Sequence, residues 1–400
     1  MSRRAFITIV LFISAAISIW AQDVPQAPKL LLNAQRLRRL RRDRERKTPR
    51  WVSFENRINT VPDSPERGFE LALYYAVTGD EAKGREGIVW ALNHVTGRQR
   101  VLVADWCAPL LTAEDKQKLL ILPFVVTGQI SSQLMRDIWF RNVVLDADLS
   151  ASLPGGNELS LRLASLESQN YKNPEELYAI FELIYTVRAA TRNDLRDVDP
   201  HLFATLPEAL LLSAKPKDFN TPPWMLHVAA LALVAIDPNL PSSQFLQSWA
   251  LEDAQMLREG PGVAYELLWA DPYLPGVGYQ NMEPWTYDDK HGRLLARANW
   301  EPTSCWIDIS TQGVKEENCP PHWQAETVTF GHLTLIPMTE RCLEIPHVSN
   351  RNDAVLVWKL KPGEGITHGT GKDKHTSAAD AAGIWHPGSA IEGKVCIASH

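Results

Sequence analysis

The side chains that could carry acid–base chemistry fall at a few places along the chain. Tyr279 and Tyr287 lie where helical periodicity stops, and either phenol could be a general acid or base or could pack at a domain interface. His94, near a predicted helix end, and His227, on an apolar helix, are expected to be cap and core residues. The last four histidines match no metal-ligand spacing and are expected in loops: His368, His375, His386 and His400.

Basic residues crowd one predicted helix near the N-terminus. One interpretation is that these clustered cations attract a polyanionic glycan or a membrane surface. The interpretation that the pattern favours is a solvated helical face, anchored through leucines on its other side. The basic residues are Arg36, Arg38, Arg39, Arg41, Arg42, Arg44, Arg46, Lys47 and Arg50, and the anchoring leucines are Leu30, Leu31, Leu37 and Leu40.

Composition and missing motifs narrow the class of protein. With 45% hydrophobic and 22% charged residues over 400 positions, the chain can form two sizeable cores. Its formal net charge of −6 argues against a nucleic-acid partner, because such partners favour basic proteins. The GxSxG, Walker A and GxGxxG patterns do not occur, which removes the common hydrolase, nucleotide and dinucleotide classes.

Helical spacing of apolar residues continues to about Asp271. The clearest pair is Arg67 to Thr78 and Glu81 to Val95, with Gly79 ending the first helix and Asp80 capping the second. Because each helix has one apolar stripe and the connectors are short, we expect antiparallel neighbours in a layered or toroidal array. Further helices are predicted at 113–126, 174–190, 223–235 and 242–258.

The pattern changes beyond Asp271 to short runs rich in Trp, Thr, Ile and Val, which favour strands. Strands are predicted at 294–298, 305–309, 327–336 and 354–358. The expected parts are a signal peptide (1–21), a helical domain (22–271), a linker (272–289) and an antiparallel β-sandwich domain (290–400).

The N-terminal segment predicts export. Arg3 and Arg4 precede an apolar run from Ala5 to Ile19, and Ala21 offers a small residue for cleavage. An uncleaved anchor is disfavoured because the run is shorter than the ~20 residues of a spanning helix. The five cysteines would then meet an oxidising compartment, where one or two disulfides can form and at least one thiol stays unpaired.

Several segments, taken in order, match one family. The first are Ala104-Asp-Trp-Cys and Leu111-Thr-Ala-Glu-Asp-Lys, followed by the run from Lys290 to Ile309 with its "R..W" pattern. His322-Trp-Gln-Ala-Glu-Thr-Val-Thr-Phe then matches an "H.H.D…F" motif, and Gly331-His-Leu and Asn352-Asp-Ala-Val-Leu-Val follow. In this order they resemble the heparinase II/III-like (alginate-lyase-like) polysaccharide lyases, in which an α/α-toroid precedes a β-sandwich.

The resemblance implies β-elimination of a uronate-containing polysaccharide. Such a site must neutralise the carboxylate, supply a base and protonate the leaving oxygen, for which Asn, His and Tyr commonly serve in this family. Carried over, His322 is a catalytic imidazole, and Tyr279 or Tyr287 is an acid or base. Asn157 could clamp the carboxylate, although an Asn at a helix N-terminus is common without such a role.

The resemblance also implies zinc between sandwich strands, with His322, Glu326 and Glu344 as ligands. The chain departs from the family where Gln324 replaces the second His and Arg351 stands at a later His position. Neither side chain is a base or a metal-ligating imidazole, so both are predicted to bind substrate. Relatives continue through many more strands after Val357, so we expect a truncated sandwich.

The sequence as a whole therefore predicts an α+β fold, in which an N-terminal α/α-toroid-like helical array precedes a truncated antiparallel β-sandwich. The predicted function is a secreted or periplasmic carbon–oxygen lyase acting on an acidic polysaccharide, with no membrane span in the mature chain. One alternative is a non-catalytic glycan-binding or scaffold protein derived from such a lyase. Another is a toroid glycoside hydrolase, for which Glu182, Glu266 and Asp271 are available carboxylates.

Overall fold

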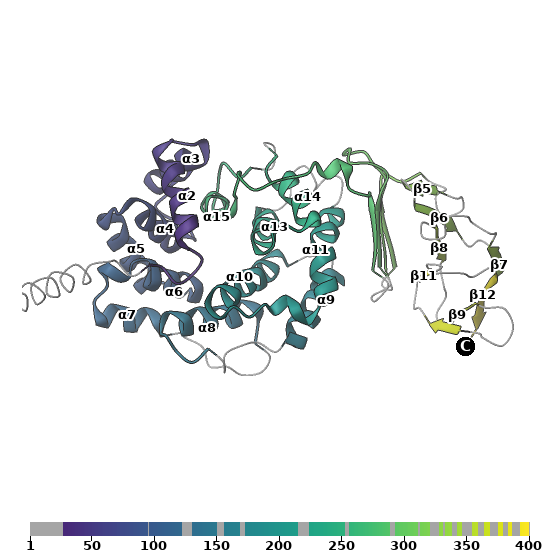
Figure 1. The fold of residues 1–400 in the computed structure, drawn as a ribbon, viewed down its shortest axis with the longest axis horizontal. Helices are drawn as coiled ribbons and strands as arrows, with labels where there is room; N and C mark the ends of the chain where they lie inside the picture. The colour runs from purple at the N-terminus through teal and green to yellow at the C-terminus, as the bar shows by residue number, and fades with distance from the viewer. Residues whose placement is uncertain are drawn as a thin grey trace, which may run out of the picture. The chain divides into compact units, whose positions relative to one another are not determined.

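The structure, a computed structural model, has an α+β fold in which helices precede strands (Figure 1). It describes residues 27–94, 96–121, 130–149, 156–168, 173–214, 224–252, 256–288, 293–310 and 313–320, and beyond these the strands given below. Within these residues the last α-helix ends at Trp269 and the first strand begins at Trp285, which confirms the predicted class. The chain divides into two compact units, Met1–Leu153 and Pro154–His400.

The described part of the first unit consists of helices. The predicted pair α4 and α5 is confirmed: Gly79 ends α4 with a left-handed φ of 77°, and the Asp80 side chain accepts a hydrogen bond from the Lys83 N–H at the start of α5. The elements are α2 (Ala34–Glu45), α3 (Pro49–Thr60), α4 (Arg67–Thr78), α5 (Glu81–Asn93), α6 (Gly97–Trp106), η1 (Ala108–Leu110), α7 (Ala113–Leu120) and α8 (Ser132–Val144).

Helix α2 presents two different faces. Leu37 and Leu40 are buried in the unit, as are Leu30 and Leu31 in the segment before the helix. Most of the basic residues that follow them in sequence are exposed or half-buried. The leucines therefore anchor the helix as expected, and most of the cations remain on its outer face. Arg36 is an exception, because it is buried and donates to the Leu31 carbonyl oxygen.

The second unit begins with a further group of helices. Helix α13 is buried from His227 to Val234 and at Ile236, because every residue of the helix except His227 is apolar, and it packs on α10 and α15. The helix predicted at 242–258 ends sooner, at Ala250. The elements are α9 (Gly156–Ser168), α10 (Pro174–Thr191), η3 (Leu195–Val198), α11 (Pro200–Ser213), α13 (Trp224–Ile236), α14 (Pro241–Ala250), α15 (Gly262–Trp269) and η4 (Tyr279–Asn281).

An antiparallel meander follows the helices. Strands β1 (Trp285–Asp288), β2 (Arg293–Arg297), β3 (Trp306–Ser310) and β4 (Gly313–Glu317) pair in sequence order. Every residue of β2 is buried, and β1 and β2 pack on α11. A disulfide between Cys305 and Cys319 joins the start of β3 to the end of β4.

Two further four-stranded sheets complete the described strands, in the orders β10-β9-β12-β7 and β11-β8-β6-β5. Strands β6 and β8 pair in parallel, unlike the purely antiparallel arrangement expected, because the connection through β7 is long enough for a crossover. The strand predicted at 327–336 is instead two strands, β5 and β6, which pair antiparallel. The bounds are β5 (Val328–Phe330), β6 (Leu333–Pro337), β7 (Cys342–Ile345), β8 (Ala354–Trp358), β9 (Glu364–His368), β10 (His375–Ala378), β11 (Gly383–Trp385) and β12 (Gly393–Ser399).

Candidate functional site

The Asp105-Trp106 pair holds the segment that leads into α2. The Asp105 carboxylate accepts hydrogen bonds from the backbone N–H of Lys29, at 3.0 and 3.1 Å, and of Leu30, at 2.8 Å. The Trp106 indole N–H donates to the Leu30 carbonyl oxygen at 2.9 Å. Burial raises the pKa of Asp105 to about 6, although both backbone N–H groups favour the ionised form.

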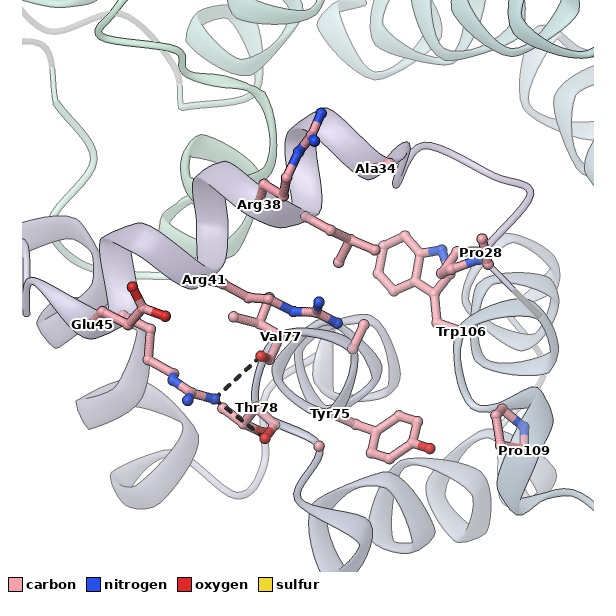
Figure 2. Close-up of a pocket in the computed structure, with 15 residues that line it drawn as sticks. Pro28, Ala34, Arg38, Arg41, Glu45, Tyr75, Val77, Thr78, Trp106 and Pro109 are labelled. Atoms are coloured by element: carbon pink, nitrogen blue, oxygen red, sulfur yellow. Dashed lines mark hydrogen bonds between the residues drawn. The ribbon is translucent and has the colours of Figure 1, made fainter. Parts of the chain in front are cut away.

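Once this segment is fixed, α2 forms one wall of a pocket of about 680 Å³ within the first unit (Figure 2). The other walls come from the C-terminal end of α4, the segment before α2, and residues at and after the end of α6. This volume suits a small ligand or a few units of a polymer. The lining residues are Ala27, Pro28, Ala34, Leu37, Arg38, Arg41, Arg44, Glu45, Tyr75, Ala76, Val77, Thr78, Gly79, Trp106 and Pro109.

The three arginines of the pocket have different environments. Arg44 donates from Nη1 to the carbonyl oxygens of Val77, at 3.3 Å, and Thr78, at 3.2 Å, so its charge caps the C-terminus of α4. Arg38 and Arg41 are exposed, and neither has an ion pair or side-chain hydrogen bond with any residue that the structure describes. Figure 2 shows Arg41 extending toward the end of α4 and Arg38 extending the other way.

The uncharged side chains complete the pocket's chemistry. Tyr75 is half-buried, and its hydroxyl has no hydrogen-bond partner within the described part of the chain. Burial raises its pKa, so the phenol stays protonated near neutral pH. An arginine fork can hold a carboxylate or sulfate with two hydrogen bonds, and the phenol can bond a hydroxyl. The pocket can therefore bind an anionic sugar, with Glu45 as the opposing charge on its lining.

In the second unit, Tyr279 lies in a cluster with Trp300 and Glu252. It is 6% exposed and meets the Trp300 ring edge to face, with centroids 5.2 Å apart. Burial raises its pKa to about 12, and the nearby Glu252 carboxylate adds to the shift. A raised pKa disfavours the phenolate, so this environment suits Tyr279 as an acid rather than as a base.

The "R..W" pattern has a structural role. The Arg297 guanidinium stacks 5.2 Å from the Trp300 ring centroid and donates to the Ala214 carbonyl oxygen at 2.9 Å. Trp306 donates from its indole N–H to the Leu212 carbonyl oxygen at 2.8 Å. Burial lowers the pKa of Arg297 to about 10, which still leaves it charged at neutral pH. These contacts tie β2 and β3 to the C-terminal end of α11.

Most of the other site residues expected from the sequence lie beyond what the structure describes. Asn157 is in the first turn of α9, Tyr287 pairs with Leu294 in the β1–β2 register, and Glu344 pairs with Lys394 in the β7–β12 register. The side chains of these three residues are outside the described set. So are the residues His322, Gln324, Glu326 and Arg351. Of the predicted catalytic residues, only Tyr279 can therefore be placed with its surroundings.

Of the three carboxylates considered for glycoside hydrolysis, Glu182 and Glu266 are in the interior of the second unit, whereas Asp271 is half-buried and accepts a hydrogen bond from the Tyr273 N–H. Glu182 is fully buried and accepts a hydrogen bond from the Tyr178 hydroxyl at 2.5 Å, and the Trp269 indole N–H donates to that hydroxyl at 2.8 Å. Glu266 is 2% exposed and accepts from the Leu257 N–H. These contacts support packing of α10 and α15.

The described residues contain no group of three or more His, Cys, Asp and Glu side chains placed to hold a metal ion. None of their helices combines the length and apolarity needed to cross a membrane.

Comparison with models of known protein families and with curated proteins gave no match to this chain.

Proposed function

We propose that this chain is secreted or periplasmic and binds an acidic, uronate-containing polysaccharide. The observation that carries the proposal is the pocket beside α2, where the cations Arg38 and Arg41 have no acid partner among the described residues. A uronate carboxylate matches the arginine fork, and the proline and tyrosine rings of the lining offer apolar faces to a sugar ring. The Cys305–Cys319 disulfide supports export, because such bonds persist in oxidising compartments.

We also propose that binding serves β-elimination, as the resemblance to the heparinase II/III-like lyases implies. The helices would then belong to an α/α-toroid-like array and the sheets to a β-sandwich. Asn157 would hold the uronate carboxylate, and His322 or Tyr287 would take the proton beside it. Tyr279 would protonate the leaving oxygen, since burial keeps its phenol protonated.

Binding without turnover is the second candidate, because the contacts of the motif residues can be explained without catalysis. Asp105 and Trp106 hold backbone groups of residues 29–30, and Arg297 holds the carbonyl of Ala214. A protein that had lost catalysis would keep these residues for stability alone. Their presence is therefore explained equally well by a glycan-binding or scaffold protein.

A pair of variants tests binding. Arg41→Ala should weaken binding to heparin, chondroitin sulfate or alginate about 10- to 100-fold, because a hydrogen bond to a charged group contributes about 1.5–3 kcal/mol. Arg42→Ala is the matched control: it removes the same charge from an exposed position of the same helix that does not line the pocket. Affinity electrophoresis and calorimetry measure the difference. Equal losses in both variants, or no binding to any of the glycans, would contradict the proposal.

Turnover is tested separately by the ultraviolet absorbance of unsaturated uronides released from the same glycans. If the chain is a lyase, His322→Ala should abolish this signal and leave binding at the α2 pocket intact. Tyr279→Phe should also lower the rate if its phenol is the acid. If the folded wild-type protein releases no unsaturated uronide from any glycan but still shows Arg41-dependent binding, the second candidate, binding without turnover, is supported.

A further inference from the structure

The five cysteines divide unevenly between the two units. Cys107, at the end of α6 in the first unit, is fully buried and unbonded, and burial raises its pKa to about 12, so it is a poor nucleophile. In the second unit Cys305 and Cys319 are joined to each other. Cys342 and Cys396 remain, one in β7 and one in β12.

The sheet register brings these two positions together. Strands β7 and β12 are antiparallel, and Cys396 is the direct register partner of Cys342. Residues directly opposite each other in an antiparallel pair have Cα atoms about 4.5–5.5 Å apart. A disulfide requires a Cα separation of about 4.4–6.8 Å. The backbone pairing therefore meets the first geometric condition for a bond between the two residues.

We propose that Cys342 and Cys396 form a second disulfide, a modification site at the C-terminal end of the fold. The two thiols lose two electrons and two protons as their sulfurs join. A protein disulfide of the thiol-oxidase class accepts both electrons and both protons when its own S–S bond breaks to a dithiol. The Cys305–Cys319 bond calls for an oxidant of the same kind.

The bond would act on a strand that pairs on one side only. Strand β7 ends the order β10-β9-β12-β7, so within the described sheet its only neighbour is β12. An edge strand with unpaired backbone groups is where a sheet frays or joins another chain. A covalent link to β12, which also pairs with β9, would hold the edge in register.

Peptide mapping of the full mature chain under non-reducing conditions tests the proposal. Trypsin, cutting after Arg341, Arg351 and Lys394, places the two thiols in the separate peptides 342–351 and 395–400. The protein is oxidised with glutathione disulfide until the Cys305–Cys319 peptide pair is complete, which provides an internal control. We then expect the 342–351 and 395–400 peptides to appear as one linked species, converted to two by reduction.

Alkylation of both Cys342 and Cys396 in that same sample, or linkage of either to Cys107, would overturn the proposal. Thermal melting provides a second readout. Cys342→Ser, Cys396→Ser and the double variant should lower the melting temperature of the oxidised protein by the same number of degrees, because each removes one shared bond. A fall in the melting temperature of the double variant equal to the sum of the two single-variant falls would also overturn the proposal.

Discussion

In the first unit the buried carboxyl of Asp105 accepts hydrogen bonds from backbone N–H groups. In the second unit the buried imidazole of His227 has no hydrogen bond to either ring nitrogen within the described residues. The His227 Nε2 atom lies 3.7 Å from Glu266 Oε2. Burial raises the pKa of Asp105 to about 6 and lowers that of His227 to about 4. Both shifts favour the neutral form, but they change stability in opposite directions as pH changes.

Two arginines that line the pocket of the first unit differ from two arginines in the β1–β4 sheet of the second unit. In the second unit Arg293 and Arg297 are buried and bonded to an Asp308 carboxylate and a backbone carbonyl, respectively. In the first unit Arg38 and Arg41 are exposed and lack such partners among the described residues. A cation already paired inside the protein has little capacity for a ligand. Arg38 and Arg41 are therefore the arginines that we propose to bind a ligand, whereas paired arginines such as Arg57, whose Nε lies 2.6 Å from Glu70 Oε1, have structural roles in the first unit as well.

Breaking a buried ion pair of the second unit should have the largest effect. Arg293 donates to Asp308 at 3.0 and 3.3 Å, and their side chains are only 5% and 2% exposed. Arg293→Met should lower the free energy of unfolding by about 3–5 kcal/mol, because it leaves Asp308 buried with a weakened partner set. Urea denaturation measures the loss.

Two further variants test that interpretation. The double variant Arg293→Met/Asp308→Leu should recover most of the stability, because no unpaired charge is left buried. Arg85→Met breaks the exposed pair with Glu81 and should cost about 0–1 kcal/mol. A loss in Arg293→Met no larger than this would show that the second unit does not depend on its paired arginine.

The second-largest expected effect is the pH dependence of stability that Asp105 causes in the first unit. The pKa of Asp105 is raised from 3.8 to about 6. Its contribution to the free energy of unfolding is therefore fully present below about pH 4 and is lost as pH rises through 6. The change amounts to about 3 kcal/mol. Asp105→Asn should therefore become more stable relative to wild type between pH 4 and pH 7, measured by urea unfolding. The exposed control Asp63→Asn should show no such trend. The prediction is wrong if the free energies of unfolding of Asp105→Asn and wild type change in parallel with pH.

His227 should respond in the opposite sense. Because its pKa is lowered from 6.5 to about 4, its contribution is fully present above about pH 6.5 and is lost as pH falls through 4. This loss is also about 3 kcal/mol. His227→Leu should remove this acid sensitivity in urea unfolding, and the exposed control His201→Leu should not. If His227→Leu loses as much stability at acidic pH as wild type does, protonation of the His227 imidazole does not destabilise the fold.

Local signals in the sequence predicted many element boundaries. Gly79 and Asp80 predicted the α4–α5 turn because a left-handed residue and an N-cap act within a few residues of themselves. The strand at 354–358 was confirmed for a similar reason, since its β-branched run is short and continuous. The parallel pairing of β6 with β8 was missed because strand order depends on contacts between distant segments.

The pocket could be predicted only in part. The arginine run was evident, but the sequence could not distinguish Arg41, which lines the pocket, from Arg42, which does not. That distinction depends on how α2 is rotated against α4, and the Asp105–Leu30 contact that fixes the segment before α2 spans 75 positions. Tyr75 was missed because its phenol belongs to a helix whose apolar stripe explains it equally well as core.

The smallest effect that we expect separates two neighbouring tyrosines of α4. Tyr75 lines the pocket, whereas Tyr74 stacks on Trp51 and donates to the Glu55 carboxylate at 3.3 Å. Tyr75→Phe should weaken glycan binding about fivefold, because one neutral hydrogen bond contributes about 1 kcal/mol. Tyr74→Phe should leave the dissociation constant unchanged in the same calorimetric titration. If the two variants bind alike, the phenol of the first unit's pocket does not contact the sugar, and the arginines alone would account for recognition.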